Sequence, residues 1–163
     1  MGGPMNGDQA TTLTDRTRLH YLDTSALLAW LMEGREVLQP LEGAQEVASS
    51  TLLWTEVSRA LHRSLQTGRL SPVDATEVRH NFARIGAGIK RLRLSDSILR
   101  RAEGPYPLVI RTLDAIHLAA AELWLDEASD RDADPGELSV WSLDERMNHC
   151  ASQLGFQTPL LIL

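Results

Sequence analysis

Four acidic residues stand out because each lies next to or within an apolar stretch of the chain: Asp23, Glu56, Asp114 and Asp144. A carboxylate beside a core segment costs free energy unless a positive charge or hydrogen bonds compensate it. Carboxylate oxygens are also the ligands that Mg²⁺ and Mn²⁺ prefer. The four acids together therefore predict a site in which a divalent cation is their shared counter-ion.

Each acid taken alone also has an ordinary structural interpretation. Asp23 and Asp144 each precede a predicted helix, where an aspartate is a good N-cap. Glu56 alone fits an exposed or ion-paired acid on a helix, and any of the four fits a structural ion pair. Only the joint occurrence of all four favours the metal site.

Two further residues near Asp114 have side chains that could take part in catalysis or in an ion pair. His117 lies three positions later, on the same helix face, where general acid catalysis is conceivable, but we interpret it as a structural histidine. Arg111 lies three positions earlier, and we expect it to pair with an acid rather than to contact phosphate. Cys150 is the one cysteine of the chain, and its apolar setting predicts a core position.

The elements that must position these residues alternate between strands and helices. Strands are predicted at 19–22, 46–50, 89–94, 138–141 and 156–161. Helices are predicted at 26–32 after a Thr24-Ser25 N-cap, and at 36–41, 51–66, 72–85, 96–102, 112–124 and 145–154. This order predicts an α/β fold, a three-layer sandwich whose central, mainly parallel sheet is flanked by helices. Ligands bind beyond the carboxyl ends of such strands, where Asp23 and Asp144 are expected.

Length and composition fit one globular domain. The chain has 163 residues, 43% of them hydrophobic, and no apolar run of membrane-spanning length. We expect residues 1–17 to be a flexible leader, residues 18–163 to be the folded domain, and residues 126–136 to form an acidic loop. No signal segment opens the chain, and a lone cysteine fits a reducing compartment, so a soluble, cytoplasmic protein is predicted.

The charge is unevenly distributed. The net charge is −6, which argues mildly against a nucleic-acid partner. The segment 79–101, however, is rich in arginine and contains Asp96 as its only acid. A solvated helix face explains such a segment equally well. Candidate RNA-backbone contacts within it are Arg91, Arg93, Arg100 and Arg101.

The motifs around the acids resemble a known family. The segment Leu22-Asp23-Thr24-Ser25-Ala26-Leu27 looks like the opening strand of PIN-domain ribonucleases, and Arg111-Thr112-Leu113-Asp114-Ala115-Ile116-His117-Leu118-Ala119 is very similar to the central motif of VapC-type toxins. Trp141-Ser142-Leu143-Asp144 resembles the C-terminal motif of that family, with Ser142 where members often have Thr. Trp54-Thr55-Glu56-Val57 supplies the remaining acid, and the resemblance covers about residues 19–160.

The resemblance implies a metal-dependent endoribonuclease, the toxin of a toxin–antitoxin pair. By this analogy Asp23, Glu56, Asp114 and Asp144 hold one or two Mg²⁺ or Mn²⁺ ions, and a metal-activated water cuts a phosphodiester of tRNA, rRNA or mRNA. Asp23 and Asp114 are the expected direct ligands, and Glu56 and Asp144 act through water.

The same analogy implies further contacts and partners. Thr24 either caps a helix or orients Asp23 or a water. Asn148 either hydrogen-bonds RNA or a metal-bound water, or is an ordinary surface residue. A cognate VapB-like antitoxin is expected to fill the groove and to neutralise the acids with a basic side chain. A homodimer is also expected, with apolar residues available for its interface at Trp30, Leu31, Leu52, Leu53 and Trp54, although core burial explains each of these as well.

Two other function classes fit less well. A catalytically inactive PIN-like binding module would share the fold without cutting RNA. A phosphotransfer enzyme with Asp23 as nucleophile would need a second acid or a well-placed lysine, but Ser25 stands two residues on and Lys90 is the only lysine. Phosphate-binding loops of the GxxxxGK[ST] type, HExxH and CxxC motifs are all missing from the sequence.

Overall fold

The computed structural model describes residues 17–44, 46–129 and 134–161. Residues 1–16, nearly all of the predicted leader, lie outside the described residues. The strands are β1 (Leu19–Leu22), β2 (Val47–Ser50), β3 (Lys90–Leu92) and β4 (Leu138–Trp141). The α-helices are α1 (Thr24–Glu33), α2 (Leu52–Gln66), α3 (Pro72–Gly86), α4 (Asp96–Ala102), α5 (Thr112–Ala128) and α6 (Glu145–Gln153). Two 3₁₀ turns, η1 (Gln39–Leu41) and η2 (Pro135–Glu137), complete the described elements.

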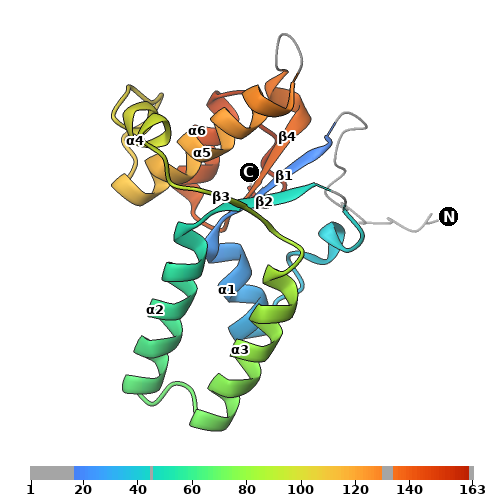
Figure 1. Cartoon of the computed structure of the whole chain (residues 1–163), viewed down its shortest axis with the longest axis vertical. Coiled ribbons are helices and arrows are strands. Elements are labelled where there is room, and N and C mark those ends of the chain that lie inside the picture. The colour runs from blue at the N-terminus through green and yellow to red at the C-terminus, as the bar shows by residue number, and fades with distance from the viewer. Residues whose placement is uncertain (1–16, 45, 130–133, 162–163) are drawn as a thin grey trace, which may run out of the picture.

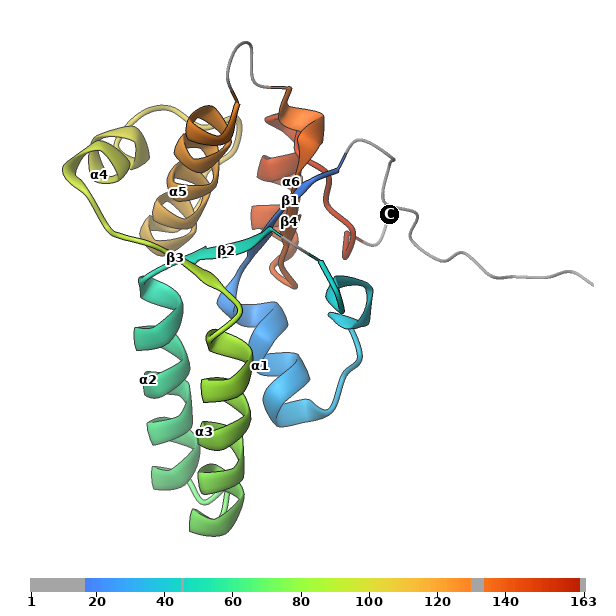
Figure 2. The same cartoon turned by 45° about the vertical axis from the view of Figure 1, so that its right-hand side comes forward.

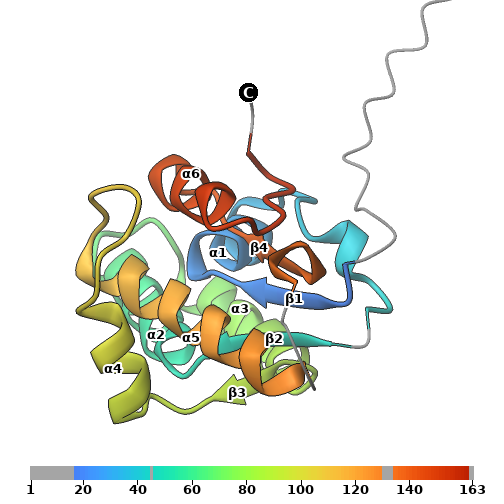
Figure 3. The same cartoon turned by 90° about the horizontal axis from the view of Figure 1, so that it is seen from above.

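The strands form a parallel sheet in the order β3-β2-β1-β4. Tyr21 of β1 aligns with Ala48 of β2 on one side and with Val140 of β4 on the other. Figure 3 shows the four strands following one another across the molecule. The connections run outward from β1 to β2 and β3, and the chain then crosses back to β4, so the strand order reverses beside β1. Such a switch point is where parallel sheets bind ligands.

Helices cover both faces of the sheet. In Figure 1, α4, α5 and α6 lie above the strands, and α1, α2 and α3 lie below them. Because side chains alternate along a strand, Tyr21 and Val140 join the cluster formed with α5 and α6, whereas Leu22 and Trp141 join the cluster formed with α1 and α2. The predicted three-layer α/β fold is confirmed.

The helices α2 and α3 form a hairpin that extends away from the sheet beside α1, as Figure 2 shows. The two helices of the hairpin pack through a small apolar cluster of Leu61, Ala75 and Val78, and Trp54 of α2 also contacts Phe82 of α3. Helix α3 begins at a complete capping box: the Ser71 hydroxyl accepts from the backbone of Asp74 at 3.1 Å, and Pro72 occupies the first turn. The start predicted from Ser71-Pro72 is confirmed.

Several predicted elements differ from those observed. The prediction of a last strand at 156–161 is wrong, because this segment joins the sheet only through the single bridge between Ser139 and Gln157. Pro159 has no N–H to donate, and a turn closes when the amide of Leu161 bonds to the carbonyl of Thr158.

The remaining differences concern one strand and three helices. Strand β3 is shorter than the predicted 89–94, because it pairs with β2 only from Lys90 to Leu92. The cap of α1 is Asp23 rather than Thr24-Ser25, because the Asp23 carboxylate accepts from the Ser25 amide. Helix α5 continues to Ala128, into the predicted acidic loop, of which residues 130–133 lie outside the described residues. The predicted helix at 36–41 is only the 3₁₀ turn η1. In the part of the chain that the structure describes, no helix is long and apolar enough to cross a membrane.

Candidate active site

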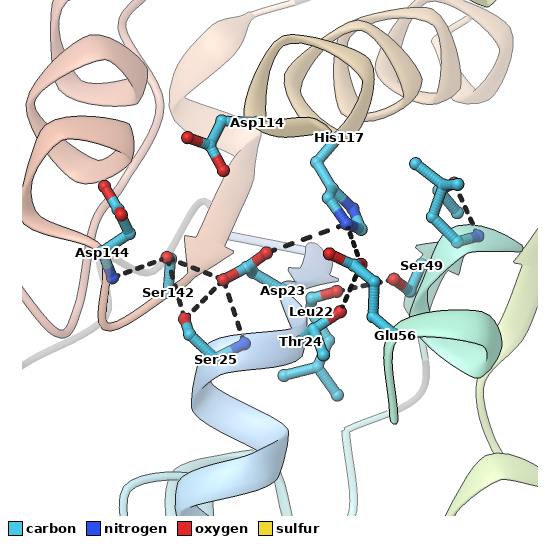
Figure 4. A network of polar contacts seen from close by, with 12 residues as sticks. Leu22, Asp23, Thr24, Ser25, Ser49, Glu56, Asp114, His117, Ser142 and Asp144 are labelled. Carbon is cyan, nitrogen blue, oxygen red and sulfur yellow. Dashed lines mark hydrogen bonds and ion pairs between the residues drawn. The ribbon is translucent and has the colours of Figure 1, made fainter. Parts of the chain in front are cut away.

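The four acids come together at the carboxyl ends of the central strands. Asp23 follows β1, and Asp144 follows β4 after a short loop. Glu56 lies in the second turn of α2, and Asp114 lies in the first turn of α5. Figure 4 shows Asp23 at the centre, with Asp114 and Asp144 to one side and Glu56 to the other. The chain thus gathers at one edge of the sheet four acids that the sequence spreads over more than a hundred residues.

Asp23 is held rigidly. It is 6% exposed, and its Oδ2 accepts hydrogen bonds from the amide and the hydroxyl of Ser25 and from the hydroxyl of Ser142 at 2.9 Å. The Ser25 hydroxyl also accepts from the Leu143 amide at 2.9 Å, which ties the loop after β4 to the start of α1. The other oxygen, Oδ1, lies 3.9 Å from Nε2 of His117. Sequence reasoning missed Ser25; its signal is a hydroxyl two residues after an acid that opens a helix.

Glu56 is paired on one oxygen. Its Oε2 accepts from the Thr24 hydroxyl at 2.7 Å and lies 2.8 Å from Nε2 of His117. Burial alone would raise the pKa of the Glu56 carboxyl, but the hydrogen bonds from His117 and Thr24 outweigh it and lower the pKa. Glu56 is therefore held as a carboxylate. The Thr24 hydroxyl thus orients Glu56 rather than Asp23, and its action on a water stays a prediction.

His117 links this carboxylate to the core. The side chain is 1% exposed, and its Nδ1 lies 2.7 Å from the Tyr21 hydroxyl, which accepts from the Ser50 amide at 3.0 Å. The Tyr21 hydrogen is then available to Nδ1, and in the neutral ring Nε2 donates to Glu56. Burial lowers the pKa of His117, but the hydrogen bond to Glu56 and the charges of Asp23, Glu56 and Asp114 raise it overall. Its buried contacts support the structural interpretation, and Tyr21 is a positioning residue that the sequence did not reveal.

Asp114 is the least compensated of the four acids. Its Oδ2 is buried and has no hydrogen-bond partner within the described residues. The nearest cation, Nε of Arg111, is 4.0 Å away on a side chain that is 76% exposed. Burial raises the pKa of the Asp114 carboxyl, and the charges of Asp144 and Asp23 raise it further. Arg111 lowers this pKa only in part, so the carboxylate is incompletely compensated.

Asp144 is occupied by two ordinary contacts. Its Oδ1 accepts from the Met147 amide at 2.9 Å as the N-cap of α6, and its Oδ2 lies 3.2 Å from the Arg111 guanidinium. The predicted ion pairing of Arg111 is confirmed. Because Asp144 is both a cap and an ion-pair partner, its geometry fits the outer position that the sequence predicts for it.

The residues predicted to contact RNA differ in their exposure and in the contacts they already make within the fold. Arg93 and Arg100 are exposed, and the Arg91 guanidinium lies over the Trp54 ring, 4.0 Å from its centroid. Arg101 is engaged within the fold, 2.5 Å from Glu122 and stacked on Tyr106. Asn148 is 2% exposed and donates to the Ser142 carbonyl at 2.7 Å. The interpretation of Asn148 as an ordinary surface residue is therefore wrong. The bond to Ser142 favours a role in shaping the loop after β4.

The donor set fits a hard divalent cation. Among the described residues no group of three His, Cys, Asp or Glu side chains forms a ready-made ligand cage. Mg²⁺, however, is usually bound by one or two carboxylates and retains several waters. The unpartnered Oδ2 of Asp114, the neighbouring charges of Asp23 and Asp144, and the oxygen-only donors are consistent with such a site.

Comparisons with known proteins agree with this arrangement. A family model described as PIN domain matches residues 20–124. The matched segment contains Asp23, Glu56 and Asp114, whereas Asp144 lies beyond its end. No curated protein and no solved structure matches the chain.

Proposed function

The chain belongs to the PIN-domain family, whose members are generally nucleases, and we propose that it is a metal-dependent endoribonuclease, the toxin of a VapBC-like toxin–antitoxin pair. The main support for the metal site comes from Asp114, which has a buried carboxylate oxygen without a hydrogen-bond partner among the described residues and lies near the charges of Asp144 and Asp23. Such a cluster is costly unless a cation joins it. The proposed nuclease domain spans residues 18–163, because Asp144 and α6 complete the acidic cluster beyond the segment that the family model matches.

The residues have separate roles in this proposal. Asp23 and Asp114 would hold Mg²⁺ or Mn²⁺ directly, and Glu56 and Asp144 would act through its waters. When bound, the cation supplies an acidified water and stabilises charge on the phosphoryl oxygens. Ser25 and Ser142 fix the carboxylate of Asp23, and His117 fixes that of Glu56.

The partners follow from charge and exposed apolar surface. Within the described residues, Arg111 is the only Arg or Lys in ion-pair reach of the four acids, so a basic side chain of a VapB-like antitoxin would add missing positive charge. A homodimer also remains part of the proposal. Of the apolar residues suggested for its interface, Leu53 is buried in the core. The exposed apolar side chains lie instead mainly around α4 and α5, where Leu99 and Val109 line a cavity of about 730 Å³.

The test is RNA cleavage by purified, antitoxin-free protein. A mixed pool of tRNA, rRNA and mRNA is incubated with Mg²⁺ or Mn²⁺, and in parallel with EDTA. We expect defined fragments only with metal and none from Asp114→Asn that circular dichroism shows to be folded. A toxin acting on these RNAs would work in the cytoplasm, so growth arrest on expression is the cellular counterpart. Cleavage that persists in EDTA would contradict the proposal.

A catalytically inactive PIN-like binding module is the second candidate. It is favoured by the ordinary contacts of the other acids: Asp23 and Asp144 are helix caps, and Glu56 is bonded to His117 and Thr24. This candidate predicts folded protein that leaves the RNA pool intact with either metal and does not arrest growth. Growth arrest without cleavage of the pool would instead indicate a nuclease of narrow specificity.

A further inference from the structure

A groove of about 530 Å³ lies between α2, α3 and β3. Two aromatic side chains, Trp54 and Phe82, and two arginines, Arg79 and Arg91, are among its lining residues. The groove and the acids lie on opposite sides of α2: Trp54 contacts Phe82 of α3 and Arg91 of β3, whereas Glu56 contacts α1 and α5. One helix diameter, about 10–12 Å, therefore separates the two sites.

The groove places the Arg91 guanidinium against the Trp54 ring, and the Phe82 ring lies beside Trp54 at an interplanar angle of 43°. The Arg91 guanidinium lies 4.0 Å from the Trp54 ring centroid, and the Trp54 and Phe82 centroids are 6.2 Å apart. A Cβ at Gly86 would approach Nε1 of Trp54 to 3.3 Å, so the glycine leaves room beside the indole. Arg91 is exposed, which leaves the outer plane of its guanidinium open to a further flat group.

The positive charge of the groove is not neutralised by the protein. Arg79 and Arg91 form no ion pair within the described residues, in contrast to Arg101, which pairs with Glu122. They belong to the segment 79–101, whose only acid is Asp96. In a chain of net charge −6, this local excess marks a surface for an anion.

We propose that this groove binds single-stranded RNA outside the acidic cluster, a role that rests on the proposed nuclease function. A base stacks on the open plane of the Arg91 guanidinium, which Trp54 supports from behind, and Arg79 contacts a neighbouring phosphate. Aromatic and guanidinium planes in a basic groove are the means by which proteins hold single strands. An acidic protein segment would use the charge but not the stack, so the observations favour RNA.

Binding is measured without metal, in EDTA, so that cleavage cannot interfere. The probes are a labelled single-stranded RNA, the same strand with abasic positions, and polyglutamate. The variants are Arg79→Gln/Arg91→Gln, which removes the charge, and Arg91→Lys, which keeps the charge but not the plane. The matched control is Arg59→Gln/Arg69→Gln, which removes two exposed arginines outside the groove.

We expect the groove double variant to bind RNA about tenfold more weakly and to lower the salt slope by about 0.7, since it loses one phosphate contact, that of Arg79, and each such contact on a single strand contributes about 0.7. Arg91→Lys should keep most of the salt slope of RNA binding but should no longer bind the intact strand more tightly than the abasic strand. The control should stay within about twofold of the wild type.

Two results would overturn the proposal that the groove binds RNA. Equal losses in the control and the groove variant would show that only overall charge matters. Arginine-dependent binding of polyglutamate in preference to RNA would identify an acidic protein segment as the ligand. Because the assay involves no cleavage, a protein without nuclease activity can still show RNA binding at the groove. A groove variant that cuts RNA and also binds it as tightly as the wild type would refute the RNA-binding role of the groove alone.

Discussion

Among the four acids of the site, Asp114 has the weakest compensation by contacts of the described residues. Burial and the charges of Asp144 and Asp23 raise the pKa of its carboxyl above the ordinary value of 3.8. A raised folded pKa means that this group stabilises the fold at low pH and that the contribution is lost as pH rises through the folded pKa. At neutral pH the metal-free protein therefore carries a destabilising charge at this position.

The substitution Asp114→Asn should consequently stabilise the metal-free protein at neutral pH while abolishing cleavage. We expect a higher Tm than that of the wild type, because the neutral amide removes the buried charge that the charges of Asp144 and Asp23 disfavour. Thermal unfolding in EDTA measures it, with Asp126→Asn, an exposed acid on the same helix, as the matched control. A loss of stability in Asp114→Asn alone would show that the carboxylate is a structural group.

His117 and Glu56 should give the fold a pH optimum. The pKa of Glu56 is lowered from 4.5, so its contribution is present above pH 4.5 and is lost as pH falls through its folded pKa. The pKa of His117 is raised from 6.5, so its contribution is present below pH 6.5 and is lost as pH rises through its folded pKa. The pair is therefore strongest between these values.

The variant His117→Gln tests this pairing, because glutamine can still bond to Glu56 but does not titrate. In EDTA, the Tm of the wild type should decline above pH 6.5 more steeply than that of His117→Gln. The two profiles should run parallel between about pH 5 and 6, where the wild-type pair is charged. Profiles that stay parallel above pH 6.5 as well would contradict the assignment, since His117 would then add no pH-dependent stability.

At the scale of elements, the site depends on how the ends of β1 and β4 are joined. The Ser142 hydroxyl donates to Asp23 and accepts from the Asp144 amide at 3.0 Å, so one side chain aligns two of the acids. Ser142→Ala should lower cleavage by about 10–100-fold, the usual cost of losing a residue that orients a metal ligand.

Ser139→Ala is the matched control for this element. Ser139 lies on β4, three residues before Ser142, is equally buried and bonds to Trp141 and His20, away from the acids. Both variants should lose about 1–3 kcal/mol of unfolding free energy, as urea denaturation would show. Comparable losses of cleavage in both would mean that the effect of Ser142 is stability alone.

The sequence predicted elements well where one local signal decides them. Ser71-Pro72 set the start of α3, and the apolar run 19–22 set β1, because capping and strand hydrophobicity act over a few residues. The apolar run 156–161 misled the strand prediction, because pairing depends on backbone donors on both sides and Pro159 lacks one.

For the whole molecule, the gathering of the acids was predictable and their contacts were not. Parallel strands bring their carboxyl ends to one edge, which places Asp23 and Asp144 together by topology alone. The bonds of His117 to Tyr21 and Glu56 join segments far apart in the chain, and no local pattern encodes them. The groove beside Trp54 likewise exists only once α2, α3 and β3 have assembled.

The proposed nuclease activity depends most directly on cation binding at the acidic cluster. Because the acids come from separate parts of the chain, a cation that joins them binds the folded state and stabilises it by about 2.7 kcal/mol at a hundred times its Kd. The measurement is the Tm of wild type, Asp114→Asn and Asp126→Asn during titration with Mn²⁺. We predict a saturable rise in the wild type and in Asp126→Asn that is lost in Asp114→Asn. Equal rises in all three, or none in the wild type, would contradict the proposed metal site.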